Sequence, residues 1–228
     1  MLRELLTIFR SDNPLRAMGE SFARMLQSTF DMTLSAGEAY FGSAVSPEDR
    51  TRIYEMDVRV NQLERSVRKQ VVAHLSVAGN TPDVPYCLLL MSLVKDVERL
   101  GDYAKNLSEA VDVRLKPLPD DEIVQELREI RRGVEEAFRS ASEIFATSDR
   151  ERALRFIQQG RGLAHRCDAL IQRIARSSYD ASTTTALVLG TRYYKRIGGH
   201  VLNVLTSVVM PLHKIDYYDE DEVEAARS

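Results

Sequence analysis

The sequence predicts an all-α protein built from two tandem three-helix bundles of long antiparallel helices. The 228-residue chain has 44% hydrophobic residues, only 11 glycines and 7 prolines, and no tryptophan, a composition that favours helices. Apolar residues recur at spacings of three and four along most of the chain, which is the helical period. These residues form six separate stripes, and the last three stripes look like a repeat of the first three.

Three long helices are predicted in the first half of the chain, at residues 14–43, 47–77 and 84–114. Asn13 and Ser46 are capping residues that each precede a proline at the first helical position, so they start the first two helices. Gly42 and Gly79 are typical helix stops. The three apolar stripes contain, in order, Leu15, Met18, Phe22 and Met25; Ile53, Met56, Val60 and Leu63; and Leu90, Val94, Val97, Ala104 and Leu107.

Three more helices are predicted in the second half, at residues 120–147, 149–178 and 183–213. The prolines and acids of residues 116–122 break the chain before them, and Ser148 with Glu151 fits a capping box at the start of the fifth helix. Their stripes contain Ile123, Leu127, Ile130 and Val134; Phe156, Gly160, Leu163 and Cys167; and Ile197, Val201, Val204 and Val208. We therefore expect a first bundle at 1–116, a second at 117–214 and an acidic tail at 215–228.

An internal echo supports the two-bundle organisation. Residues 95–107 align with residues 192–204, and the alignment places Arg99 on Arg196 and Gly101 on Gly198. An asparagine follows each glycine five residues later. The second helix of each half aligns in the same way, with a longer turn in the first half.

Charge and cysteine content limit the class of protein. The net charge of -3 and the pI of about 5.9 do not favour wholesale binding to nucleic acid or to an anionic membrane. Cys87 and Cys167 form no CxxC motif, which favours a reduced compartment. The start MLRELLTIFR does not resemble a secretory signal, and the longest uncharged apolar stretches are far shorter than the ~20 residues of a membrane span. We expect a soluble, cytoplasmic protein.

Two segments carry a family resemblance: ERLGDYAKN at residues 98–106 and MDVRVNQLE at residues 56–64. They resemble the PhoU family of phosphate-signalling regulators, whose motif is an acid and an aspartate four residues apart on a helix, followed by Ala-x-Asn. The six helices, the repeat and the length extend the resemblance to nearly the whole chain. The second copy of the motif departs from the pattern, because Lys195 replaces the acid and Gly199 replaces the aspartate.

The resemblance implies a regulator that is not an enzyme. It implies a cytosolic adaptor, often a homodimer, that meets the ATPase of a phosphate ABC transporter and a sensor histidine kinase, and reaches the membrane only through these partners. Such a protein represses phosphate-starvation signalling when phosphate is plentiful. The same helices would suit an accessory protein of a non-ABC, sodium- or proton-coupled phosphate permease, or a metal-binding interaction module. A di-iron oxidase is disfavoured, because none of the four histidines has a glutamate three residues before it.

Five oxygen-bearing side chains are candidate metal ligands: Asp57, Asn61, Glu64, Glu98 and Asp102. They border the apolar stripes of helices two and three, which a short connection makes antiparallel neighbours. We therefore expect their oxygens to converge in the crevice between these helices. Oxygen ligands without His or Cys suit a hard cation such as magnesium, manganese, calcium or ferric iron. Some members of the resembled family bind iron or zinc clusters through these acids.

An ordinary solvated face is the alternative for the acid pair. Glu98 and Asp102 are helix neighbours whose like charges repel by about 0.2–0.5 kcal/mol. In a chain with 34 acids, several such pairs arise by chance, and Arg99 and Lys105 are available as local partners. Gly101, which costs about 1 kcal/mol in a helix interior, would let the two helices approach closely.

Any metal is expected in the first bundle only. At the matching positions of the second bundle, Lys195, Gly199 and Ala164 offer no ligand, because a protonated amine does not coordinate. A different, zinc-like site is an alternative there, formed by His165, Asp168 and His200.

Overall fold

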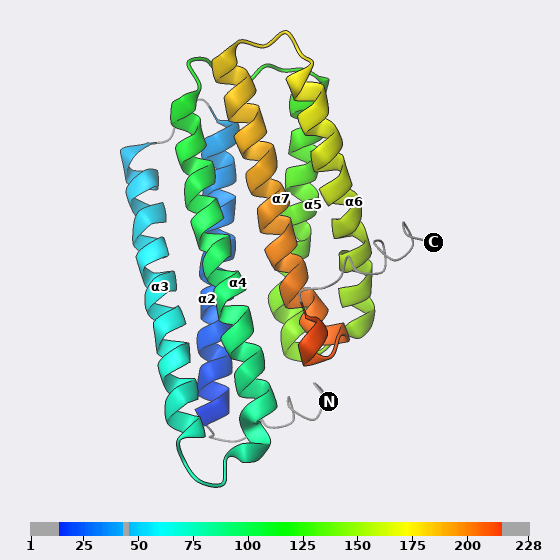
Figure 1. Cartoon of the computed structure of the whole chain (residues 1–228). Helices are drawn as coiled ribbons and strands as arrows, with labels where there is room; N and C mark the ends of the chain where they lie inside the picture. The colour runs from blue at the N-terminus through cyan, green and yellow to red at the C-terminus, as the bar shows by residue number, and fades with distance from the viewer. Residues whose placement is uncertain (1–13, 43–45, 216–228) are drawn as a thin grey trace.

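Six long helices form the computed structural model, which describes residues 14–42 and 46–215 (Figure 1). They are α2 (Pro14–Phe41), α3 (Pro47–Leu75), α4 (Val84–Glu109), α5 (Glu122–Thr147), α6 (Arg150–Ala175) and α7 (Ala181–Val209). Three short 3-10 helices are η2 (Thr81–Asp83), η3 (Ala110–Val113) and η4 (Leu212–Lys214). The described residues contain no strand, and the all-α prediction is confirmed.

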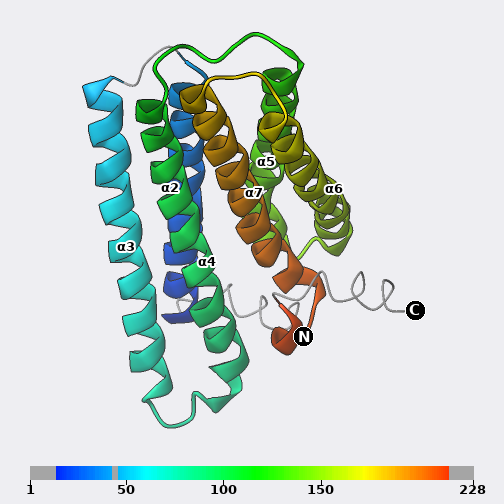
Figure 2. The same ribbon diagram turned by 45° about the horizontal axis from the view of Figure 1, so that its top comes forward.

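The helices form two three-helix bundles that lie side by side (Figures 1 and 2). Helices α2, α3 and α4 pack against one another, as do α5, α6 and α7. The bundles are joined mainly through α4 and α7, with a smaller contact between α2 and α5. This is the predicted tandem arrangement. The division of the chain into separate domains at residue 116 stays a prediction.

The helix starts test the predicted caps. Ser46 caps α3, because its hydroxyl accepts a hydrogen bond from the Asp49 N–H and so satisfies a donor that the helix leaves unpaired. The capping box predicted at Ser148 is wrong. Ser148 ends α5 in a left-handed conformation with φ 54°, and Asp149 caps α6 by accepting from a backbone N–H three residues later. The cap predicted at Asn13 lies outside the described residues.

The helix ends differ from the prediction by a few residues. Helix α4 ends at Glu109 and its last turn tightens into η3, whereas the prediction extended it to residue 114. Helix α7 ends at Val209 instead of 213, because Pro211 interrupts the backbone hydrogen bonding there. Gly42 directly follows α2, as predicted for a stop. Gly79 lies in the loop after α3 with φ 99°, a conformation that favours glycine.

Buried apolar residues from both bundles form one continuous core. Aromatic pairs link α2 to α5: the ring centroids of Phe22 and Phe145 are 5.0 Å apart, and those of Phe30 and Phe138 are 5.4 Å apart. Such pairs add about 0.5–1.5 kcal/mol beyond the apolar area that they bury. Among the described helices, none is long and apolar enough to cross a membrane.

Tyr40 anchors α2 against α7. Its hydroxyl donates a 2.8 Å hydrogen bond to the Ala186 carbonyl, and its ring is fully buried. Gly190 makes room for this ring, because a Cβ at that position would lie 2.3 Å from the ring's Cζ atom. The two bundles therefore meet with little freedom to slide at this end of the seam.

Candidate functional site

The predicted α3–α4 crevice is here the border along which these two contacting helices meet, and it carries the predicted acids. Asp57 and Glu64 lie on α3, and Glu98 and Asp102 lie on α4. Asp57 is 8% exposed, and the side chain of Glu98 is 13% exposed, so both carboxylates have lost most of their water. Asn61 is half-buried on α3, one helical turn after Asp57. The sequence placed these residues correctly at the border between core and solvent.

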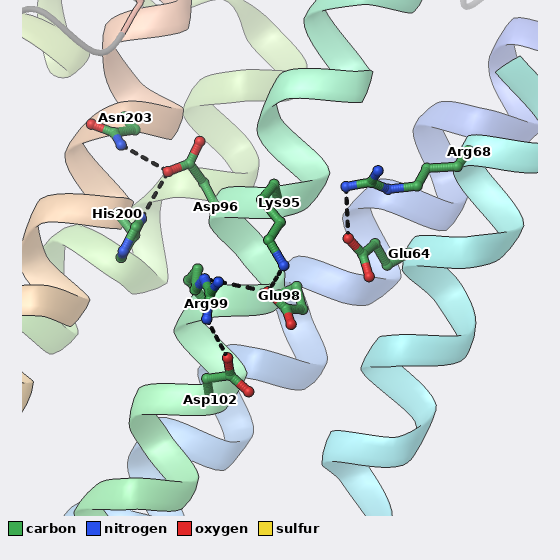
Figure 3. A network of polar contacts seen from close by, with 9 residues as sticks. All are labelled: Glu64, Arg68, Lys95, Asp96, Glu98, Arg99, Asp102, His200 and Asn203. Carbon is green, nitrogen blue, oxygen red and sulfur yellow. Dashed lines mark hydrogen bonds and ion pairs between the residues drawn. The ribbon is translucent and has the colours of Figure 1, made fainter.

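Three of the four carboxylates are paired with a cation of their own helix (Figure 3). Spacings of three or four residues bring helix side chains together, and such pairs contribute about 0.2–0.5 kcal/mol each. The distances are 2.7 Å from Lys95 Nζ to Glu98 Oε2, 3.0 Å from Arg99 Nη1 to Asp102 Oδ2, and 2.9 Å from Arg68 Nη2 to Glu64 Oε1. These carboxylates are therefore neutralised locally, as an ordinary solvated face predicts.

Asp57 differs, because its cation comes from the opposite helix. Lys105 Nζ on α4 donates to Asp57 Oδ2 across 3.1 Å. The same ammonium group lies 5.8 Å from the ring centroid of Tyr54, whose hydroxyl donates to Glu109. Desolvation lowers the pKa of Lys105, but the hydrogen bond to Asp57 and the charges of Asp57, Asp102 and Glu109 outweigh it and raise the pKa. Lys105 is thus held firmly in its charged form.

Gly101 is not required for the close approach of the helices. A Cβ at this position would lie 3.5 Å from Thr29 Cγ2, 3.6 Å from Val60 Cγ1 and 3.7 Å from Asp57 Oδ1. These are ordinary van der Waals distances, so an alanine fits without movement. The close-approach explanation suggested by the sequence is wrong for this glycine.

The candidate ligands do not form a coordination shell as they are placed. Within residues 14–42 and 46–215, no three His, Cys, Asp or Glu side chains gather closely enough to hold a metal ion. The oxygens suit a hard cation in their chemistry, but each of the four carboxylates is paired with a lysine or an arginine. The predicted convergence of the five side chains is not seen, and metal binding stays a prediction.

The second bundle has an ion pair in place of the acid motif. Both carboxylate oxygens of Asp168 on α6 accept from Lys195 Nζ on α7, at 2.6 and 2.5 Å. Gly199 and Ala164 line a cavity of only about 50 Å³ nearby. The alternative zinc-like site is not formed among the described residues, because His200 turns toward α4.

A polar cluster at the seam between the bundles escaped the sequence analysis. Asp96 Oδ1 on α4 accepts 2.7 Å hydrogen bonds from His200 Nδ1 and Asn203 Nδ2 on α7 (Figure 3). The His200 ring also stacks on Tyr103 at 5.6 Å between centroids. The partners are 104 and 107 residues apart in the chain. In the sequence, the one indication of this cluster was the position of Asp96 directly beside Val97 of the core stripe.

A second polar cluster joins α5 to α2, with Arg131 and Glu135 largely buried and Glu38 exposed. Arg131 Nε donates across 2.6 Å to Glu135 Oε1, and the other side of the guanidinium group donates to Glu38 on α2. Burial raises the pKa of Glu135, although the Arg131 charge works in the opposite direction. Phe41 packs against the same guanidinium group, 5.4 Å from its carbon. The Arg131–Glu38 pair and the Asp96 cluster add directional polar contacts to the apolar packing between the two bundles.

A cavity of about 820 Å³ opens between the start of α4, the α5–α6 turn and the end of α7. Its walls are mainly apolar, with Leu89 and Met210 among them, and Asp149 and Arg150 lie at the turn. None of the five predicted site residues lines it. The cavity and the α3–α4 crevice are therefore separate features.

Comparisons with known proteins agree with the family resemblance. The model of the PhoU domain matches residues 22–111, which run from α2 to η3. The phosphate transport system regulatory protein PhoU from Streptococcus pneumoniae matches with a TM-score of 0.73 and 15% identity, over 89% of this chain and 95% of that chain. PhoU from Pseudomonas aeruginosa matches with a TM-score of 0.66 and 20% identity, over 94% and 99% of the two chains. A search of curated proteins finds no match.

The two kinds of comparison cover different parts of the chain. The domain match lies in the first bundle, whereas the structural matches extend over both bundles. At identities of 15% and 20%, the structural likeness shows the fold alone. The chain therefore carries a PhoU domain at residues 22–111 and has the fold of two PhoU proteins over most of its length.

Proposed function

We propose that the chain regulates phosphate uptake and phosphate-starvation signalling as a non-enzymatic adaptor in the cytoplasm. It meets the ATPase of a phosphate ABC transporter and a sensor histidine kinase, and reaches the membrane through them. One observation carries the proposal: a PhoU domain within a fold that covers 95% of a chain described as a phosphate transport system regulatory protein. The acids of the α3–α4 crevice are already neutralised by basic side chains, which is consistent with a protein that acts by binding other proteins.

Gene deletion tests the regulatory role. With abundant phosphate, we expect the deletion strain to express a phosphate-starvation reporter that the parent strain keeps silent, and to change its rate of phosphate uptake. Restoring the intact gene should silence the reporter again. Unchanged uptake and an unchanged reporter in the deletion strain would end the proposal.

A pull-down from phosphate-replete cells tests the partners. We expect the tagged chain to recover the transporter ATPase, the histidine kinase or both, whereas the tag alone recovers neither. Recovery of a sodium- or proton-coupled phosphate permease instead would replace the ABC adaptor role with the accessory role.

The proposal also includes a homodimer. Sedimentation should give twice the mass of the chain at micromolar concentration. A single-chain mass across the whole concentration range would remove the dimer from the proposal and leave the regulatory role unaffected.

A further inference from the structure

Asp57, the most buried acid of the α3–α4 crevice, is neutralised by an ion pair with a lysine of the other helix. Asp57 is 8% exposed, and a buried carboxylate needs a counter-charge because it has lost its hydration. Lys105 supplies that charge from α4, 48 residues away in the chain. The pair therefore links the two helices at the point where the sequence predicted a metal ion.

The Lys105 side chain is better sheltered than the other cations of the crevice. It is 25% exposed, whereas those of Lys95 and Arg99 are each 46% exposed. The ring of Tyr54 lies beside its ammonium group, and Glu109 fixes that ring through the tyrosine hydroxyl. The outer cations can swing into water at little cost, but Lys105 has to leave both Asp57 and the ring.

A metal ion at Asp57 and the Lys105 ammonium group exclude each other. The ammonium group occupies Asp57 Oδ2, and its positive charge repels a dication that approaches the other oxygen. A hard dication also needs about six oxygen ligands, which the described side chains do not assemble. The Lys105 side chain thus already provides the positive charge that a metal ion would bring to Asp57.

We propose that Lys105 is the resident cation of the α3–α4 crevice, so that the native chain binds hard divalent cations there weakly and loss of the lysine side chain exposes a cation site at Asp57. The crevice is then a neutralised surface in the native protein. Loss of Lys105 frees the Asp57 carboxylate alone, because Lys95 and Arg99 still pair with Glu98 and Asp102. The proposal concerns the isolated protein, so it is tested independently of phosphate regulation.

Binding of Mn²⁺ to purified protein tests the proposal, with free Mn²⁺ measured by electron paramagnetic resonance. Lys105→Met keeps the length and apolar stem of the side chain and removes its charge. We expect it to bind one Mn²⁺ about tenfold or more tightly than the native chain, since a repelling charge within a few ångströms is removed. Mn²⁺ should also raise the melting temperature of this variant more than that of the native chain.

Two control variants separate the local effect from net charge. Lys69→Met makes the same charge change on an exposed position of α3 and should leave Mn²⁺ affinity at the native value. Asp57→Asn combined with Lys105→Met removes both partners and should lose the gain in affinity. Circular dichroism monitors folding, and Lys105→Gln replaces Lys105→Met if the latter does not fold.

Three results would overturn the proposal. The first is equal Mn²⁺ affinity of the native chain and the Lys105 variant. The second is an equal gain from Lys69→Met, which would assign the effect to net charge. The third is a gain that survives in the double variant, because the site would then not include Asp57.

Discussion

Replacing Gly101 with alanine should stabilise the protein, although this glycine lies within the family motif. Alanine is favoured over glycine in a helix interior by about 1 kcal/mol. The new Cβ would meet its three nearest neighbours at 3.5, 3.6 and 3.7 Å, so no overpacking offsets this gain. For a protein of this size, about 1 kcal/mol corresponds to a rise in melting temperature of about 2–4 °C.

Urea unfolding followed by circular dichroism measures the effect as a shift of the midpoint at constant slope. Gly190→Ala is the matched control, because its Cβ would lie 2.3 Å from the Tyr40 ring. The control should lose about 1–3 kcal/mol through overpacking. Destabilisation of Gly101→Ala by 1 kcal/mol or more, or equal behaviour of the two variants, would refute the packing argument.

Three further predictions test other parts of the fold. Ser148→Gly should stabilise the chain by up to about 1 kcal/mol in thermal unfolding, because the left-handed φ of 54° costs an L residue about 1–2 kcal/mol and the greater freedom of glycine in the unfolded chain offsets part of that gain. A loss of stability would show that the hydroxyl matters. Burial raises the pKa of Cys87 to about 11 and that of Cys167 to about 12, so at pH 8 almost no reactive thiolate exists. A thiol reagent should therefore label both cysteines only after denaturation. Rapid labelling of the native protein would contradict their burial. Asp96→Ala removes the acceptor shared by two side chains of α7 and should cost about 1–3 kcal/mol in urea unfolding; an unchanged midpoint would exclude a stabilising role.

The helices were predictable because each one buries a stripe that repeats at the helical period. Ser46 was also readable, since a serine before a proline caps a helix within a few residues of chain. Ser148 was misread because the same side chain suits both a helix start and a turn. The preference of Asp149 for the cap position was available in the sequence but competed with the more familiar capping-box pattern.

The candidate site was only partly predictable, because its ability to bind a metal ion depends on which basic side chains pair with the acids. Periodicity placed Asp57 and Glu98 at the edge of the core. The contact of Lys105 with Asp57 depends on the register between α3 and α4, which no local pattern specifies. The hydrogen bonds of Asp96 join residues about one hundred positions apart, so only the packed structure brings them together.

Helix α4 belongs to the first bundle and also makes the main contact with α7 of the second bundle. Lys105 pairs with Asp57 on α3. Glu98 lies on the side of α4 toward α3, whereas Asp96, only two residues away, bonds to His200 on α7 (Figure 3). A protein that bound the first bundle and favoured one position of α4 would therefore change the contacts of α7 as well. Given such a coupling, thermodynamic reciprocity would require that a change at the seam alter affinity at the α3–α4 crevice by the same factor. A single helix in contact with both halves would then link them without refolding of either one.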